Sequence, residues 1–289
     1  MGWRIIVIST PCRLNYKNNF LIIRSEELKM VHLSEISTIL LENSQISLSN
    51  YLINELIKNK IQIIFCDERH NPSAEIMPFY ASFNSSKKIC QQIAWEDERK
   101  KLLNTYIIQN KIDNQRKFLQ LNNKSEHKLL ETYLEQLEFD DVTNREGHSA
   151  KVYFNALFEK SFTREEESSI NAMLDYGYTI ILSCFNRTLA SLGYLTQLGI
   201  NHKNEFNEFN FSCDLMEPFR VLIDEFAYSH LSAQLSSENK YKIVDILNNK
   251  KIYEGKEQYV SNVIRRYVEN CINFLNGATD EYIAFEYEL

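Results

Sequence analysis

Residues 39–67, ILLENSQISLSNYLINELIKNKIQIIFCD, change periodicity twice and decide the fold of the N-terminal part of the chain. The stretch opens on a short apolar run typical of a buried strand. Leucines then recur at helical spacing, which predicts a helix over 49–58 with Ser47 or Ser49 as its cap. The segment 61–67 returns to a β-branched, apolar pattern. The stretch therefore predicts a strand–helix–strand unit.

Strand-like segments also precede this unit. They are rich in β-branched residues, and two of them form a predicted hairpin joined through Lys17-Asn18. The upstream segments cover residues 3–8, 13–16, 19–24 and 31–33. Together with the strand–helix–strand unit, this meander predicts a small N-terminal β-domain over residues 1–75.

Helical periodicity dominates the remainder of the chain. Proline and Asn-Ser-Ser breakers place a linker at 76–88, followed by a larger all-α domain over 89–289. The predicted helices cover residues 88–120, 126–138, 145–159, 165–196, 213–235 and 257–275. The fold class is therefore α+β, with the β-domain first and the all-α domain second.

Composition excludes several classes of protein. The 289 residues include only seven glycines, and there is no GxGxxG, GxxxxGK[ST], HExxH or GxSxG motif. No apolar stretch approaches the ~20 residues of a membrane span, and no secretory signal is expected. The six cysteines are scattered, which is typical of reduced thiols in a cytosolic protein.

Charge is distributed unevenly along the chain. The net charge of −7 argues against a nucleic-acid binder as a whole. Residues 85–125, however, carry nine basic and four acidic side chains, which gives this segment a net charge of +5. Its candidate phosphate contacts are Lys87, Lys88, Arg99, Lys100, Lys101, Arg116 and Lys117. Solvated helix faces are the alternative interpretation.

Three places in the helical half carry candidate chemistry. Glu146 lies near a helix start, His202 lies in a polar loop, and Asp214 and Glu217 are spaced i,i+3 on one helical face. Each has a structural alternative: an acid that complements the helix dipole, a surface histidine, or a capping box. As a set, two or three carboxylates and one imidazole suit Mg²⁺ or Mn²⁺.

These residues lie in short sequence motifs that match those of a known family. The chain resembles the CRISPR-associated spacer-acquisition integrase, the universal adaptation protein of CRISPR systems, in its type II-A form. The matching words are Arg145-Glu146-Gly147, Asn171-Ala172-Met173-Leu174-Asp175-Tyr176-Gly177-Tyr178, Gly199-Ile200-Asn201-His202 and Ser212-Cys213-Asp214-Leu215-Met216-Glu217-Pro218-Phe219-Arg220. Their order and intervals agree with the family over the whole chain.

The resemblance implies a site and a set of partners. Glu146, His202 and Glu217 fall on the catalytic, metal-ligand positions, with Asp214 as a second acid and Arg220 within reach of a DNA phosphate. It implies a homodimer formed through the β-domains, a small companion adaptation protein in a hetero-hexamer, and a bacterial cytoplasm. Other type II-A CRISPR proteins are further expected partners. Many relatives have aspartate at the position of Glu217, which still donates oxygen.

The implied reaction is a transesterification of double-stranded DNA. The 3′-hydroxyl ends of a captured fragment attack phosphodiesters at the ends of a CRISPR repeat, with Mg²⁺ or Mn²⁺ as cofactor. Two alternatives use the same residues differently. One is a stand-alone metal-dependent nuclease on branched DNA, and the other is a non-catalytic dimeric scaffold whose carboxylates are helix caps.

Overall fold

A hairpin turn sets the register of the first strands. The computed structural model describes residues 2, 4–68, 71–78 and 84–287. Strands β2 (Arg13–Lys17) and β3 (Phe20–Arg24) pair antiparallel. Asn18 and Asn19 between them have φ angles of 50° and 65°. Two successive left-handed residues match the twist of a two-residue hairpin. The predicted hairpin is confirmed, but its turn is Asn18-Asn19 rather than the predicted Lys17-Asn18, because Lys17 still pairs with Phe20.

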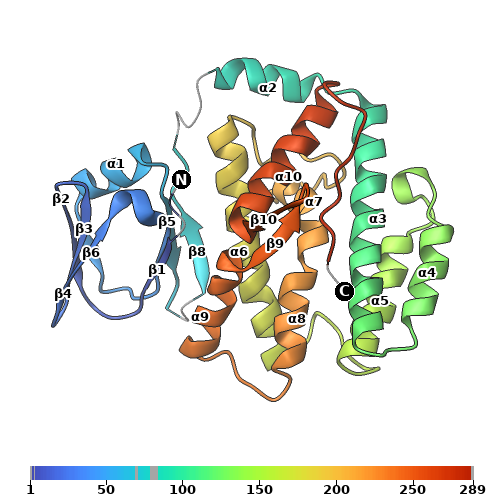
Figure 1. Cartoon of the computed structure of the whole chain (residues 1–289), viewed down its shortest axis with the longest axis horizontal. Helices are drawn as coiled ribbons and strands as arrows, with labels where there is room; N and C mark the ends of the chain where they lie inside the picture. The colour runs from blue at the N-terminus through green and yellow to red at the C-terminus, as the bar shows by residue number, and fades with distance from the viewer. Residues whose placement is uncertain (1, 3, 69–70, 79–83, 288–289) are drawn as a thin grey trace. The chain divides into compact units, whose positions relative to one another are not determined.

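The strand-rich part contains two four-stranded sheets (Figure 1). One has the order β4-β3-β2-β6 and includes the predicted meander, and the other has the order β1-β5-β7-β8. In the second sheet β1, β5 and β7 run parallel, and β8 pairs antiparallel with β7. The remaining strands are β1 (Arg4–Ile8), β4 (Leu28–His32), β5 (Ile36–Leu41), β6 (Ser47–Leu48), β7 (Gln62–Cys66) and β8 (Pro72–Glu75). The meander alone therefore accounts for only one of the two sheets.

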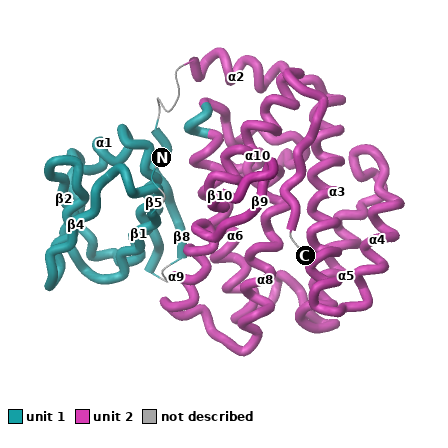
Figure 2. The backbone as a smooth tube through the Cα atoms, viewed as in Figure 1, with its two compact units in different colours: residues 1–83, 190–192 teal, residues 84–189, 193–289 magenta. Residues whose placement is uncertain are grey.

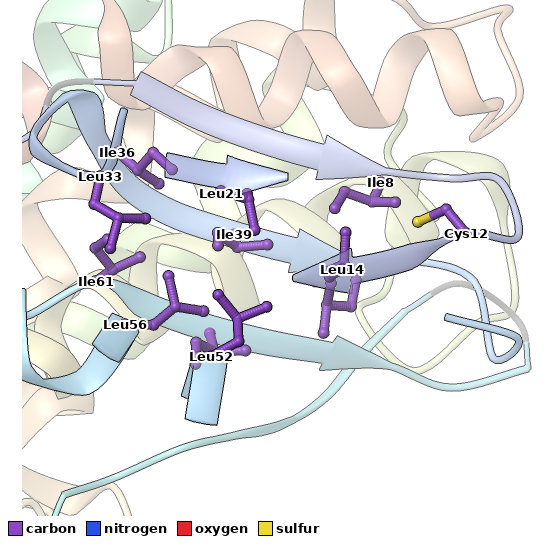
Figure 3. Packing of buried hydrophobic residues seen from close by; sticks show 12 residues of the cluster. Ile8, Cys12, Leu14, Leu21, Leu33, Ile36, Ile39, Leu52, Leu56 and Ile61 are labelled. Carbon is purple, nitrogen blue, oxygen red and sulfur yellow. The ribbon is translucent and has the colours of Figure 1, made fainter. Parts of the chain in front are cut away.

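Helix α1 (Asn50–Lys58) packs its apolar face into the core of this unit. Its start is fixed by Ser49, whose Oγ accepts a hydrogen bond from the backbone N–H of Leu52 at 3.2 Å. Leu52 and Leu56 are 0% and 1% exposed and meet apolar side chains from both sheets (Figure 3). Full burial of such a side chain contributes ~1.5–3 kcal/mol. The predicted helix and the second of its two candidate caps are confirmed.

The segment predicted as a linker is partly ordered secondary structure. Residues 79–83 lie outside the described part of the chain, whereas helix α2 already begins at Ser85. Strand β8 begins at Pro72, a residue interpreted from sequence as a breaker. Proline is tolerated at the first position of an edge strand because no ladder N–H is needed there.

The second part of the chain is predominantly helical, as predicted. Its helices are α2 (Ser85–Ile93), α3 (Asp97–Leu121), α4 (His127–Glu135), α5 (Arg145–Leu157), α6 (Ser169–Leu192), α7 (Asn210–Met216), α8 (Val221–Ser229), α9 (Ser237–Asp245) and α10 (Val260–Leu275). Short 3₁₀ turns occupy Phe139–Asp141, Glu217–Phe219 and Ile246–Asn248 here, and Leu33–Glu35 in the strand-rich part. Helix α3 packs against α4, α5, α8 and α10, so it is the central support of this unit (Figure 1).

Several predicted helices are divided, and the C-terminal domain is not entirely helical. The helix predicted at 88–120 is broken at Trp95, whose buried ring stacks on Tyr194 and bonds Asn276. A hairpin of β9 (Lys250–Tyr253) and β10 (Lys256–Tyr259) lies within the helical unit. The description of this domain as all-α is therefore corrected by one two-stranded hairpin.

The C-terminal segment is tied to α3 by two buried asparagines. Asn110 bonds both the N–H and the C=O of Phe285, at 3.0 and 2.8 Å. Asn114 accepts from the N–H of Tyr287 and donates to the carbonyls of Phe285 and Pro218. Because Pro218 follows Glu217, this network also fixes the backbone of a candidate site residue.

The chain divides into two compact units (Figure 2). Unit 1 comprises residues 1–83 and 190–192, and unit 2 comprises residues 84–189 and 193–289. Among the residues that the structure describes, no helix combines the length and apolar character needed to cross a bilayer. All candidate site residues belong to unit 2.

Candidate active site

Glu146 is positioned by the start of α5. The side chain of Asn144 caps this helix by accepting from the N–H of Gly147 at 3.3 Å. The carboxylate of Asp141 accepts from the N–H groups of Arg145 and Glu146, at 2.7 and 3.0 Å. Asp141 therefore satisfies the helix terminus, and the carboxylate of Glu146 is not needed for that task.

Glu217 opens the 3₁₀ turn Glu217–Phe219, with Pro218 in its first turn as expected. Its side chain is only 8% exposed, and Arg220 donates to its Oε1 at 2.9 Å. Burial alone would raise the pKa of Glu217. The charges of Arg220 and Lys111 outweigh this effect and lower the pKa to about 2. Glu217 is therefore a buried, ionised carboxylate.

Lys111 of α3 joins the two glutamates. Its Nζ lies 2.6 Å from Glu146 Oε1 and 2.5 Å from Glu217 Oε2. Burial by itself would lower the pKa of Lys111, but the charges of Glu217 and Glu146 reverse this and raise it. Two carboxylates from distant parts of the sequence thus converge on one positively charged atom. This point of the structure stabilises a cation.

His202 is held by the buried carboxylate of Asp214, whose side chain is 1% exposed. Asp214 accepts from the N–H groups of Ile200, Asn201 and His202, at 2.7, 3.1 and 3.0 Å. It also contacts His202 Nδ1 at 2.5 Å. A Cβ atom on Gly199 would lie 2.5 Å from the carbonyl oxygen of His202, so this close turn requires glycine.

The capping-box interpretation of Asp214 and Glu217 is wrong. Helix α7 begins at Asn210, so Asp214 lies inside it and cannot serve as its cap. Its carboxylate instead binds the loop that carries His202. Glu217 pairs with Lys111 rather than reaching back to the helix start.

The contact with Asp214 determines which ring nitrogen of His202 is available. The Asp214 carboxylate accepts three backbone N–H groups, so His202 Nδ1 donates to it. In the neutral ring Nε2 then remains as an acceptor. This hydrogen bond raises the pKa of His202 against the effect of burial, and the charges of Glu217 and Glu146 raise it further.

The donor set fits an oxygen-preferring divalent cation. Lys111 Nζ is the stand-in positive charge between Glu146 and Glu217. The buried Oε2 of Glu217 has this ion pair but receives no well-aligned hydrogen bond from any described residue. In the described part of the chain, no three His, Cys, Asp or Glu side chains are close enough to form a complete metal site. The structure thus brings the glutamates together and places His202 with Asp214.

A further buried carboxylate lies seven residues beyond Glu217. Asp224 is fully buried and accepts hydrogen bonds from the hydroxyls of Tyr153, at 3.0 Å, and Tyr178. Burial raises the pKa of Asp224 to about 6. The guanidinium of Arg220 lies 4.5 Å from the centre of the Tyr178 ring. This cluster supports the arginine that binds Glu217.

Sequence analysis missed Lys111, Tyr153 and Asp224. Tyr153 follows Glu146 by seven residues, so a helical projection places both on one face of α5. Asp224 bears the same spacing to Glu217, although two helical elements separate them. Lys111 carries no local signal, because it resembles the other basic residues of its segment.

The predicted DNA contacts differ in their surroundings. Arg99 binds the carbonyl of Phe274 at 2.7 Å and the carboxylate of Asp280 at 2.5 Å. Arg116 and Lys117 both pair with Asp113, at 2.7 and 3.0 Å. The other candidates behave as follows: Lys100 pairs with Asp97 at 2.6 Å, Lys101 with Asp140 at 3.5 Å, Lys88 lies 6.0 Å from the Tyr194 ring, and Lys87 is exposed.

Comparisons with known proteins identify the family of this chain. The family model of CRISPR associated protein Cas1 matches residues 5–251. A CRISPR-associated endonuclease Cas1 from Neisseria meningitidis serogroup C (strain 8013) is 31% identical over 256 residues, 86% of this chain and 84% of that protein.

Solved structures share the fold. A casposase bound to integration product superposes with a TM-score of 0.79 at 19% identity, over 100% of this chain and 95% of that one. A chain of a Cas6-RT-Cas1–Cas2 complex gives a TM-score of 0.74 at 19% identity, over 100% of this chain and 36% of that one. At these identities the likeness concerns the fold alone.

Proposed function

The chain belongs to the Cas1 family of CRISPR-associated proteins, and from this membership we propose that it is a metal-dependent DNA integrase and endonuclease of CRISPR adaptation, in a type II-A system. It inserts short captured DNA fragments as new spacers into the CRISPR array. The observation that carries the proposal is the convergence of Glu146 and Glu217 on one cation position, at 2.6 and 2.5 Å.

The acidic and basic residues of the site have different roles in the reaction. Glu146 and Glu217 would hold the divalent cation, with His202 Nε2 as the third donor, and Mg²⁺ or Mn²⁺ at this place would supply Lewis-acid polarisation of a phosphodiester. Arg220 fixes Glu217 through its Nε and presents the rest of its guanidinium to a phosphate. Asp214 holds the His202 ring in the tautomer that leaves Nε2 as an acceptor.

The exchange replaces one phosphodiester by another. The 3′-hydroxyl oxygen of the fragment forms a bond to phosphorus, and the bond to the 3′-oxygen of the repeat breaks. His202, when it is not holding the cation, accepts the proton of the attacking hydroxyl and returns it to the leaving oxygen. Because one ester is exchanged for another, no nucleotide cofactor is consumed. With water as nucleophile, the same site cuts DNA.

The proposed partners follow from the reaction and from the relatives. Substrates are double-stranded DNA fragments and the CRISPR repeat, and basic residues of the 85–125 segment supply phosphate contacts. A homodimer formed through the β-domains joins a small companion adaptation protein in a hetero-hexamer. The solved complex that contains Cas1 and Cas2, and the casposase bound to integration product, support these two sets of partners.

A strand-transfer assay tests the proposal. The protein, its companion and a plasmid that carries a CRISPR repeat are incubated with a short duplex and MnCl₂, and joined products are followed on gels. We expect joining at the repeat ends that is lost in Glu146→Ala and His202→Ala. Cutting without joining would favour a stand-alone nuclease. Full metal-dependent activity in both folded variants would favour a non-catalytic role for these residues.

A further inference from the structure

The ammonium of Lys111 occupies the point where the two glutamates meet. It lies 2.6 Å from Glu146 Oε1 and 2.5 Å from Glu217 Oε2. The side chains of Lys111 and Glu217 are only 11% and 8% exposed. Two carboxylates of equal charge repel each other strongly at such a site unless a cation lies between them. Lys111 supplies that cation from within the chain.

We propose that Lys111 is an exchangeable internal cation, which holds Glu146 and Glu217 together in the metal-free protein and is displaced when a divalent ion binds the same oxygens. This inference rests on the proposed metal-dependent function. An ammonium and a metal ion cannot share one position between the same two oxygens. The affinity for the metal is therefore the intrinsic affinity reduced by the cost of displacing Lys111.

Lys111 is the partner that leaves, and Arg220 is the partner that stays. Arg220 binds the other oxygen of Glu217, Oε1, at 2.9 Å, and its guanidinium is held over the Tyr178 ring at 4.5 Å. Lysine is a point charge on a flexible four-carbon stem, which moves away by changing rotamers. At Glu217 Oε2 the contact that displacement removes is the one with Lys111 Nζ, at 2.5 Å.

The first test measures Mn²⁺ binding without DNA. Lys111→Met removes the charge and retains an unbranched apolar stem. We expect a lower melting temperature in the absence of metal, because the two glutamates lose their compensating charge. In MnCl₂ titrations by calorimetry we expect a dissociation constant about tenfold lower than that of the wild type. Unchanged or weaker Mn²⁺ binding by the folded variant would overturn the proposal.

Lys117→Met is a matched control on the same helix. Lys117 has a similar exposure of 14% and pairs with Asp113 at 3.0 Å and Glu286 at 3.4 Å. This variant also loses a partly buried ion pair. We expect its Mn²⁺ dissociation constant to equal that of the wild type. If Lys117→Met lowers the Mn²⁺ dissociation constant as much as Lys111→Met does, the overall charge of the protein, rather than the position of Lys111, sets the affinity.

A second measurement needs no variant and therefore does not depend on folding. Amine acetylation by an N-hydroxysuccinimide ester is followed at single lysines by mass spectrometry, with and without MnCl₂. We expect acetylation of Lys111 to become several-fold faster when Mn²⁺ binds, while that of Lys117 is unchanged. No increase at Lys111 under saturating Mn²⁺ would contradict displacement.

Glu217→Gln separates this inference from the proposed function. If the wild type binds Mn²⁺ and Glu217→Gln does not, the proposed metal site is supported. The Lys111 measurements then test only whether the metal ion displaces Lys111. If the wild type shows no binding that depends on Glu217, the proposed metal site and the exchange both fail.

Discussion

Two acidic arrangements in unit 2 are neutralised in opposite ways. Glu146 and Glu217 are compensated by the side chain of Lys111, which comes from a different helix, and Glu217 is compensated by Arg220 as well. Asp214 is compensated by three backbone N–H groups of the loop 200–202 and by His202 Nδ1. A side-chain cation can be exchanged, whereas backbone N–H groups are fixed by the fold. The first arrangement is suited to binding, and the second to positioning.

The largest expected effect follows from removing a charge in the exchangeable arrangement. Glu217→Gln preserves size but leaves one fewer carboxylate for the cation, so strand transfer should fall by about 10²–10³-fold. The measurement is the initial rate of joined product at saturating MnCl₂. Glu238→Gln, which removes a 76% exposed carboxylate paired with Lys242, is the control and should retain wild-type rates. A Glu217→Gln rate within tenfold of the wild type would contradict the assignment.

Asp224 is a further buried carboxylate, and it differs from the two arrangements above in its hydrogen-bond donors. Its donors are the neutral hydroxyls of Tyr153 and Tyr178. Its folded pKa is raised by burial from an ordinary 3.8 to about 6. Between these values the folded state binds more protons than the unfolded state, so stability falls as pH rises. Relative to Asp224→Asn, the wild type should lose about 3 kcal/mol of unfolding free energy between pH 3.5 and pH 7.

Urea unfolding at several pH values measures this difference. The two proteins are compared by how their unfolding free energy changes with pH, and not by its absolute value. The reason is that asparagine also changes the hydrogen bonds to Tyr153 and Tyr178. Parallel pH profiles for the wild type and Asp224→Asn would show that Asp224 has the same pKa in the folded and unfolded states, and would contradict the raised pKa.

Removing the charge from the positioning arrangement should have a smaller effect on the reaction. Asp214→Asn cannot accept from three N–H groups and the imidazole together, so His202 loses its fixed orientation. Strand transfer should fall by about 10–100-fold. The decisive control is the His202→Ala background, in which Asp214→Asn should have no further effect on the rate. Additive losses in the double variant would show that Asp214 acts independently of His202.

The sequence predicts elements that are determined locally. The hairpin at Asn18 and Asn19 and the cap at Ser49 depend on residues within a few positions of each other. The fold class follows from the change of periodicity along the chain. The parallel pairing of β1, β5 and β7 is set by tertiary contacts and is not visible in a single sequence.

The site is only partly predictable for the same reason. The Asp214–Glu217 spacing fits a capping box, but the structure starts the helix at Asn210 and gives both carboxylates other partners. Lys111 is one of nine basic residues in its segment. Its role exists only because α3 lies beside both the start of α5 and the turn at Glu217.

The two glycines that adjoin these arrangements give the smallest and most local prediction. An added Cβ on Gly199 would lie 2.5 Å from the backbone carbonyl of His202, whereas one on Gly147 would meet the side-chain oxygen of Asn144 at 2.8 Å. The Asn144 side chain can rotate away, although it then gives up its hydrogen bond from Gly147, whereas the backbone of the loop held by Asp214 cannot move aside. Gly199→Ala should therefore cost about 1–3 kcal/mol of unfolding free energy, and Gly147→Ala less than about 1 kcal/mol.

Thermal and urea unfolding of the two variants measure this difference directly. If the loop 199–202 is as rigid as its hydrogen bonds imply, Gly199→Ala also lowers the Asp214-dependent part of strand transfer, whereas Gly147→Ala leaves it intact. Equal costs at the two glycines would mean that the loop yields as readily as the Asn144 side chain. Such a result would contradict the description of the Asp214 arrangement as fixed. Backbone N–H groups that move cannot hold His202 in one orientation before the reaction begins.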